Sequence, residues 1–334
     1  MKVTGFTFIR NAIKLDYPIV EAIKSILPIC DDFVVAVGNS EDDTLKLIQS
    51  IEPSKISIIQ TLWDDTLREN GAVLATETNK AFQAIGIESD WAFYIQGDEV
   101  IHEQYLEIIH KAMVYYKNRN DIDGLLFNYL HFYGSYDYVG ASTKWYHEEI
   151  RVIKNNKQIF SFKDAQGFRK NDNQKLNVAK IPAFVYHYGW VKEPKAMQLK
   201  QESFNRLWHD DDWMKENIIQ TEFFEYEDHV TQLNKFDGTH PKVMEDRINN
   251  KNWKFDYDIS RNNRSFKDRI KDILLKVGIN SSYQNYRLKE VYKNDKESYI
   301  FIQMKEIGGW PCNVDDRKNK LLSNYFPKIN LKSS

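Results

Sequence analysis

Two neighbouring carboxylates stand directly after a buried-strand pattern in the first third of the chain. Residues 91–95 are five apolar residues in a row, which is typical of a strand buried on both faces of a sheet. Gln96 and Gly97 end this run, and Asp98 and Glu99 follow. We expect Gly97 to allow a sharp turn, because glycine adopts backbone angles that other residues avoid.

Such a turn places Asp98 and Glu99 past the C-terminal end of a strand, which is the edge where open α/β sheets bind ligands. Carboxylate oxygens at that edge suit Mg²⁺ or Mn²⁺ bridging a diphosphate. An acidic opening turn of a helix is the alternative, because Asp and Glu are favourable there.

The elements that must position these carboxylates alternate between strand and helix patterns. We therefore expect an α/β fold with a mostly parallel sheet flanked by helices. The predicted strands cover residues 3–9, 33–37, 55–60 and 91–95, and the predicted helices cover 18–27, 45–51 and 69–85.

Polar residues also follow the first two predicted strands. Arg10 and Asn11 come directly after the first strand, and a turn containing Ser40 comes after the second. The C-terminal ends of parallel strands meet at one edge of a sheet, so these residues are expected near Asp98.

Three strand-end motifs together resemble the nucleotide-sugar half of an inverting, family-two-like glycosyltransferase with the GT-A fold. The resemblance covers about residues 1–190. The motifs are Arg10-Asn11, Ser40-Glu41-Asp42-Asp43-Thr44 and Gln96-Gly97-Asp98-Glu99.

The resemblance implies a nucleotide-sugar pocket and a divalent cation, Mn²⁺ or Mg²⁺. Gln96 stands where the family has its first motif acid, and an amide can still accept a hydrogen bond from a ribose hydroxyl. Glu99 would orient the donor sugar or support Asp98. The residues expected to bind the nucleotide sugar are Arg10, Asn11, Ser40, Gln96, Gly97 and Asp98.

The resemblance also implies a second metal ligand and a catalytic base. His187, in a Tyr-His-Tyr-Gly-Trp stretch, is similar to a late histidine that completes the metal site with Asp98; a structural histidine is the alternative. Asp164 falls where the family has a loop acid that takes the acceptor proton. Asp172 and Glu149 are the reserve candidates for this base.

Composition limits the function further. The chain has 334 residues, with 46 basic and 48 acidic side chains, which argues against a nucleic-acid partner. Two cysteines, no signal-peptide pattern and no long apolar run predict a reducing, cytoplasmic setting.

We expect a GT-A catalytic domain over residues 1–240 and a mainly helical, basic C-terminal extension over 241–334. The catalytic domain would comprise a nucleotide-binding half, 1–103, and an acceptor half, 104–240. Residues 265–277 mix basic and apolar side chains, so peripheral contact with the inner face of a membrane is a further expectation.

The expected function is inverting transfer of a sugar from a nucleoside diphosphate sugar, UDP-sugar favoured, to a hydroxyl group. The acceptor would be a glycan or a lipid-linked molecule in bacterial surface-glycan synthesis.

Two alternatives stay open. A nucleotidyltransferase would normally show a Gly-rich loop after the first strand, which Phe8-Ile9-Arg10-Asn11 lacks. A non-catalytic GT-A binding module is favoured mainly by Gln96.

Overall fold

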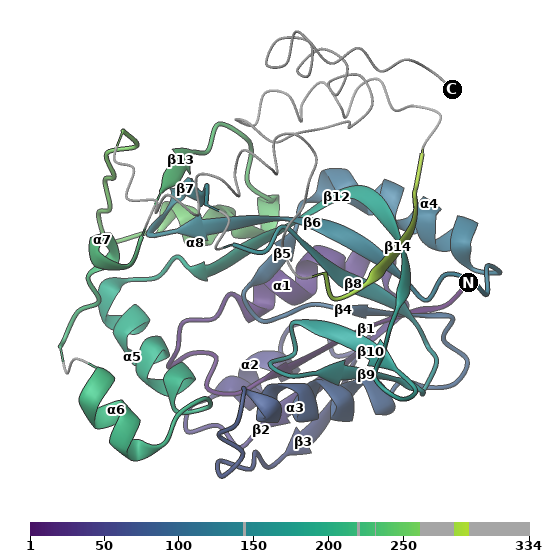
Figure 1. Ribbon diagram of the computed structural model, residues 1–334, viewed down its shortest axis with the longest axis horizontal. Coiled ribbons are helices and arrows are strands. Elements are labelled where there is room, and N and C mark those ends of the chain that lie inside the picture. The colour runs from purple at the N-terminus through teal and green to yellow at the C-terminus, as the bar shows by residue number, and fades with distance from the viewer. Residues whose placement is uncertain (143–144, 219–220, 231, 261–283, 294–334) are drawn as a thin grey trace, which may run out of the picture.

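The protein is a mixed α/β structure built on one large sheet (Figure 1). The computed structural model describes residues 1–142, 145–218, 221–230, 232–260 and 284–293. In these residues the main sheet has eleven strands, and a separate small sheet has three. The predicted α/β fold with a helix-flanked sheet is thereby confirmed.

The first part of the chain forms the parallel part of the sheet, in the order β3-β2-β1-β4. All seven predicted elements are present, with ends shifted by a few residues. They are β1 (Val3–Ile9), α1 (Ile19–Ile26), β2 (Asp32–Gly38), α2 (Thr44–Gln49), β3 (Ile56–Thr61), α3 (Ala72–Gln83) and β4 (Trp91–Tyr94).

The middle of the chain extends the same sheet with pairs of both directions. β8 (Glu148–Lys154) is antiparallel to β4 and to β6 (Gly124–Tyr133). β12 (Asn177–Trp190) is parallel to β6 and antiparallel to β5 (Glu99–Ile101). The other elements here are η2 (Glu103–Tyr105), α4 (Leu106–Tyr116), β7 (Ser135–Gly140) and the small sheet of β9 (Ile159–Phe162), β10 (Gly167–Lys170) and β11 (Gln174–Lys175).

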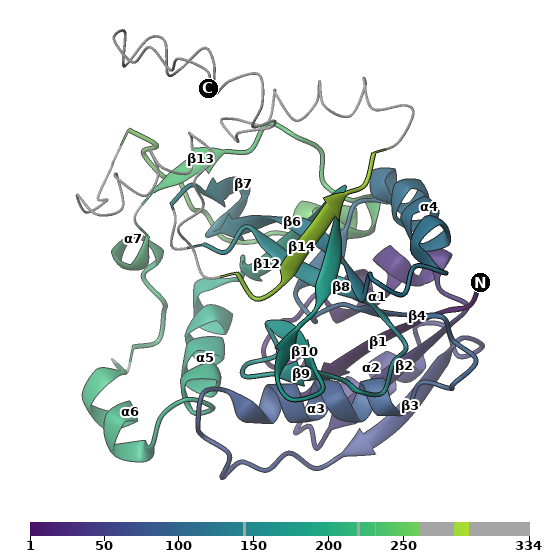
Figure 2. The same ribbon diagram turned by 45° about the vertical axis from the view of Figure 1, so that its right-hand side comes forward.

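Short helices follow β12, and α5 and α6 stand on the side of the molecule away from the N-terminus in both front views (Figures 1 and 2). Among the described residues, no helix combines the length and the hydrophobicity needed to cross a bilayer. These elements are α5 (Pro194–Asn205), α6 (Asp211–Asn217), α7 (Tyr226–His229), β13 (Leu233–Lys235), η3 (Lys242–Met244) and α8 (Glu245–Asn249), while η1 (Leu27–Ile29) follows α1.

The C-terminal extension differs in part from the expected helical segment. η3 and α8 are helical, but β14 (Arg287–Val291) is a strand parallel to β12, so it joins the main sheet (Figure 2). Alternation of polar and apolar residues there is too weak to have predicted a strand. The basic segment 265–277 lies outside the described residues.

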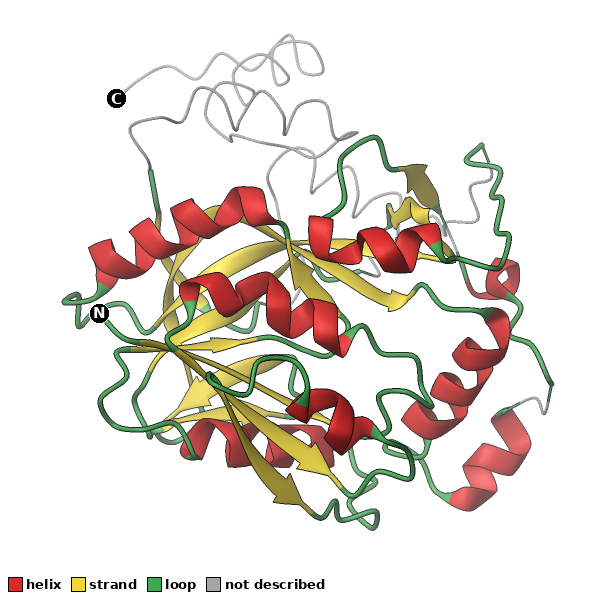
Figure 3. Cartoon of the chain, turned by 180° about the vertical axis from the view of Figure 1, so that it is seen from behind, coloured by secondary structure: helices red, strands yellow, loops and turns green. Residues whose placement is uncertain are grey.

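Both faces of the sheet are buried. In β2, Phe33, Val35 and Val37 face the core under α1 and α4, and Val34 and Ala36 face the core under α3. Figure 3 shows α1 and α4 lying across one face of the strands. This explains the continuous apolar runs of the central strands, since alternate residues fill opposite cores.

A buried ion pair and one tyrosine join β5, β6 and β8 behind the turn that follows β4. Arg151 donates to both carboxylate oxygens of Glu99, at 2.7 and 2.8 Å, and Tyr129 donates to the same carboxylate at 2.8 Å. Glu99 and Arg151 are 0% and 1% exposed, so the pair is fully desolvated. The Arg151 guanidinium also lies 5.3 and 5.2 Å from the ring centres of Tyr94 and Tyr129.

We predict that Arg151→Met destabilises the protein by about 3–5 kcal/mol, because Glu99 is then a buried charge without its partner. The double variant Glu99→Gln/Arg151→Met should lose less than the sum of the two single variants. Chemical denaturation measures all three. Lys46→Met, which removes a surface ion pair with Asp43, is the control and should lose little stability. If the loss of stability in the double variant equals the sum of the two single losses, the coupling between Glu99 and Arg151 is contradicted.

Candidate active site

A cleft of about 790 Å³ opens at the C-terminal ends of β1 and β4. The loop 163–166, the end of β12 and helix α5 form its other walls. Seven of the nine residues expected to act in the site line this cleft. They are Arg10, Asn11, Gln96, Gly97, Asp98, Asp164 and His187. The other two, Ser40 and Glu99, lie behind its wall.

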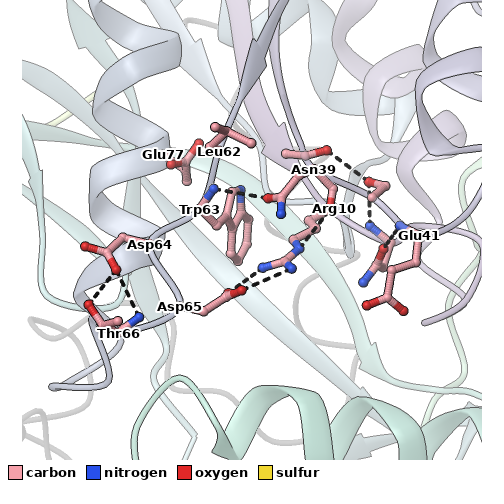
Figure 4. Close-up of polar contacts among 12 residues, drawn as sticks. Arg10, Asn39, Glu41, Leu62, Trp63, Asp64, Asp65, Thr66 and Glu77 are labelled. Atoms are coloured by element: carbon pink, nitrogen blue, oxygen red, sulfur yellow. Dashed lines mark hydrogen bonds and ion pairs between the residues drawn. The ribbon is translucent and has the colours of Figure 1, made fainter.

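Arg10 forms one corner of the cleft together with the segment that follows β3 (Figure 4). Its guanidinium donates to Asp65 at 2.6 and 3.4 Å and to the carbonyl of Asn39 at 3.2 Å. It lies 5.5 Å from the ring centre of Trp63. Arg10 therefore reaches the cleft as an anchored cation beside an aromatic face.

Ser40 has a structural role, because its hydroxyl links the ends of β1 and β2. The hydroxyl accepts from the backbone N–H of Asn11 at 3.0 Å and donates to the carbonyl of Gly38 at 3.1 Å. The Asn11 side chain in turn accepts from the N–H of Glu41 at 2.7 Å, and Asn11 has a left-handed φ of 55°. These bonds fix the shape of the rim.

Gly97 differs from what the sequence suggested, and the position of Glu99 fits only one of its two expected roles, the support of Asp98. Gly97 has no positive φ, and a Cβ there would lie 3.0 Å from Ile9 Cδ1, a close contact that a small shift of the Ile9 side chain would relieve. Glu99 does not reach the cleft, since β5 pairs with β12 and turns its carboxylate inward to Arg151. Glu99 also accepts from the N–H of Gln96 at 3.1 Å, so it braces the turn that carries Asp98.

Asp98 is held by a lysine that the sequence did not single out. The ammonium of Lys200, on α5, donates to Asp98 Oδ2 at 3.0 Å and to the carbonyl of Gly189 at 2.7 Å. Burial alone would raise the pKa of Asp98, but the charge of Lys200 and the hydrogen bond that it donates outweigh burial and hold that pKa below its usual range. Asp98 is therefore ionised, with a cation already beside it.

His187 presents a nitrogen lone pair toward Asp98. His131 Nε2 lies 2.8 Å from the carbonyl of Tyr146, and a carbonyl only accepts, so this nitrogen carries the proton. Burial lowers the pKa of His131 well below its usual value, so its Nδ1 is an acceptor, and His187 Nδ1, 3.1 Å away, must donate to it. Burial also lowers the pKa of His187, which leaves its Nε2 unprotonated, 3.7 Å from Asp98 Oδ1.

The space beside Asp98 and His187 is kept open by a glycine. A Cβ on Gly189 would lie 2.7 Å from both Asp98 Oδ2 and His187 Nε2. Adjacent ligands of a Mg²⁺-like ion lie about 3 Å apart, so these two side chains could share one cation after a small adjustment. In the described residues no group of three or more His, Cys, Asp or Glu side chains is placed to share an ion. The donor set fits a cation whose other ligands come from a bound molecule and water.

Asp164 stands on a tight loop across the cleft from β1. Lys163 and Ala165 on either side have left-handed φ values of 56° and 61°. Gln96 donates from its side-chain nitrogen to the carbonyl of Ala165 at 3.2 Å, so the rim after β4 holds this loop. Burial raises the pKa of Asp164, which favours proton uptake at a half-buried carboxylate.

The two reserve carboxylates lie in different environments. Asp172 is exposed on the turn between β10 and β11 and does not line the cleft. Glu149 is buried on β8, and its Oε2 has no hydrogen-bond partner. Burial raises the pKa of Glu149 to about 8; Arg151 opposes this, and the charges of Asp164 and Glu99 add to it.

Sequence reasoning missed Lys200, His131 and Trp63. Lys200 is one of several lysines in a helical pattern, and only the fold brings it across to Asp98. His131 had a weak signal, since it is a histidine inside an apolar strand run, as His187 is. Trp63 follows β3 just as Arg10 follows β1, and extending the strand-end argument to β3 would have found it.

Comparison with known proteins gives remote structural similarity. No protein-family model and no curated protein matches the chain. TarS from S. aureus is 13% identical over 66% of this chain and 41% of the TarS chain, with a TM-score of 0.35. TarS 1-349 in complex with UDP is 12% identical over 66% of this chain and 68% of that chain, with a TM-score of 0.34.

Glucosyl-3-phosphoglycerate synthase from Mycobacterium tuberculosis, in complex with Mn²⁺, UDP and phosphoglyceric acid, is a further match. It is 15% identical over 39% of this chain and 43% of that chain, with a TM-score of 0.27. All these TM-scores lie below 0.5, so these similarities carry no conclusion about function.

We predict that Glu149 makes stability fall as pH rises. Its pKa is about 8 when folded and about 4.5 when unfolded, so between these values the folded state holds a proton that the unfolded chain has lost. The free energy of unfolding should therefore decrease by up to about 1.4 kcal/mol per pH unit from this group. Glu149→Gln stays neutral and should lack that decrease.

Denaturation curves of the wild type and Glu149→Gln from pH 5 to 8.5 measure this effect. The stability of the variant relative to the wild type should grow across the range. Asp172→Asn, on the exposed turn, is the control. A difference between wild type and Glu149→Gln that stays constant with pH would contradict a protonated Glu149.

Proposed function

We propose that this protein is a GT-A-type glycosyltransferase that moves a sugar from a nucleoside diphosphate sugar to a hydroxyl acceptor with inversion. One observation carries the proposal: seven residues chosen for these roles from separate parts of the chain share one cleft at the ends of β1 and β4. That edge of a parallel sheet is where nucleotide ligands bind in open α/β folds.

The nucleotide would lie on the side of Arg10 and Asn11. Trp63 offers a flat face beside the Arg10 guanidinium, which suits a planar base. The side-chain nitrogen of Gln96 donates to the carbonyl of Ala165, so the side-chain oxygen would accept a hydrogen bond from a ribose hydroxyl. UDP-sugars are the favoured donors.

The diphosphate would lie at Asp98 and His187. A divalent cation, Mn²⁺ or Mg²⁺, held by these two side chains would act as a Lewis acid toward the departing diphosphate. Asp98 Oδ1 and His187 Nε2 face each other beside the gap that Gly189 leaves, which supports this placement. Glu99 would support Asp98 from behind, through Gln96 and Arg151.

Asp164 would act as the base. The acceptor oxygen bonds to the anomeric carbon on the face opposite the diphosphate and gives its proton to the Asp164 carboxylate. The bond from the anomeric carbon to the diphosphate breaks, and its electron pair leaves on the diphosphate oxygen. The burial that raises the pKa of Asp164 supports this role, because a base works best with a pKa nearer to neutral.

The acceptor would be a glycan or a lipid-linked molecule in bacterial surface-glycan synthesis, used in the cytoplasm at the inner face of the membrane. Tyr146 and Trp190 line the cleft and offer aromatic faces to a sugar ring. In this assignment residues 1–103 bind the nucleotide, residues 104–240 bind the acceptor, and 241–334 are an extension.

The proposal is tested by offering the purified protein a panel of nucleoside diphosphate sugars with Mn²⁺ and measuring binding by calorimetry and release of nucleoside diphosphate. We expect micromolar to millimolar binding of one nucleotide class and slow release, and Asp164→Asn should lower release by about 10²–10⁴-fold while nucleotide affinity stays unchanged.

Asp172→Asn is the control and should turn over normally, because Asp172 is exposed away from the cleft. Absence of nucleoside diphosphate binding at millimolar concentration would overturn the proposed function. Binding without any release, over all donors and a set of glycan acceptors, would favour a non-catalytic module. Normal turnover by Asp164→Asn with loss in Glu149→Gln would move the base to Glu149.

A further inference from the structure

Lys200 contacts Asp98, at the place proposed for the diphosphate. It lies on α5, faces the cleft, and is 12% exposed. Its ammonium has three donors; one goes to Asp98 Oδ2 at 3.0 Å and one to the Gly189 carbonyl at 2.7 Å. A lysine this deep needs a partner, since an unpaired buried charge is costly.

The position of Lys200 affects both of the ligands expected at Asp98. A divalent cation at Asp98 and His187 would lie beside an ammonium that already neutralises the carboxylate, so the two positive charges repel each other. A diphosphate brings negative charge and acceptor oxygens to the same place, and these can take the lysine's hydrogen bonds. The ammonium is compact and carried on a flexible stem, which lets it change partners without moving the helix.

From this geometry we propose that Lys200 is a binding residue for the donor diphosphate and that it makes cation binding depend on the nucleotide. With the cleft empty, Lys200 pairs with Asp98 and weakens binding of a free divalent cation. With a nucleoside diphosphate bound, Lys200 hydrogen-bonds a phosphate oxygen, and Asp98 becomes available to the cation. This inference rests on the proposed function, and it adds a residue outside the strand-end motifs.

Neighbouring groups support a local role for Lys200. The Tyr17 ring centre lies 5.1 Å from Lys200 Nζ and 4.7 Å from Lys192 Nζ, so both lysine side chains pack against one tyrosine ring. Lys192 is fully buried and donates to the carbonyl of Asp16, which keeps it out of the cleft. Lys200 is thus the one of these two lysines that can reach a ligand.

The test compares Lys200→Met, Lys200→Arg and the control Lys195→Met. Lys195 lies on the same helix with a side chain 58% exposed, paired with Glu222. Two titrations are made on each protein: Mn²⁺ alone, followed by electron paramagnetic resonance, and UDP in the presence of a chelator, followed by calorimetry.

Lys200→Met should bind Mn²⁺ alone about 10-fold more tightly and metal-free UDP about 10-fold or more weakly, as expected for loss of one charged hydrogen bond. Lys200→Arg keeps the charge and should stay closer to the wild type in both titrations, and Lys195→Met should match the wild type. Opposite changes in the two affinities are not expected from a merely structural lysine.

If the wild type binds UDP and Lys200→Met binds it with the same affinity, the proposed role of Lys200 is wrong, while the proposed function stands. Unchanged or weaker Mn²⁺ binding overturns its effect on the cation. Failure of the wild type to bind UDP overturns the proposed function as well. If Lys200→Met does not fold, Asp98→Asn/Lys200→Met removes both charges, and it must bind metal-free UDP more weakly than Asp98→Asn for the proposal to stand.

Discussion

The desolvated pair of Glu99 and Arg151 is the constraint on which the C-terminal edge of β1 and β4, where the cleft opens, depends. It joins β5 and β8, and Tyr129 adds β6 to the same network. Glu99 also accepts from the N–H of Gln96, so the turn bearing Asp98 is held from behind as well as by Lys200 in the cleft. A buried pair costs desolvation energy and is poor evidence for stability by itself. Its value here is positional, because it turns the Glu99 carboxylate to the interior, so that of these two neighbouring carboxylates only Asp98 faces the cleft.

Charge compensation organises the cleft in the same way. Asp98 is paired with Lys200, and Arg10 is paired with Asp65. A hydrogen bond to His131 orients the His187 ring. Each side chain is thus held in one position before a ligand arrives, which reduces the ordering cost of binding. Gly189 completes the arrangement, because any larger residue would fill the space between Asp98 and His187.

The sequence was most informative where local pattern and burial agree. Residues 91–95 read as a strand because both faces of β4 are buried, and the strand-end rule brought Arg10, Asn11 and Asp98 to one edge. The sequence-based prediction failed where contacts between distant parts of the chain determine the position of a residue. Three residues after a turn were enough to form β5 against β12, which turned Glu99 inward, and Lys200 reaches Asp98 only because α5 crosses the cleft. The turn at Gly97 does not use a positive φ, so the conformational role expected of this glycine is not found.

The central claim is that a nucleoside diphosphate occupies the cleft with its phosphates at Asp98, His187 and Lys200. A crystal structure of the protein with UDP and Mn²⁺ tests it most directly. The account predicts the diphosphate within hydrogen-bond distance of the Lys200 ammonium, with the ion contacting Asp98, and the base on the side of Arg10 and Trp63. A nucleotide bound outside this cleft, or bound within it with the phosphates away from Asp98, would contradict the account.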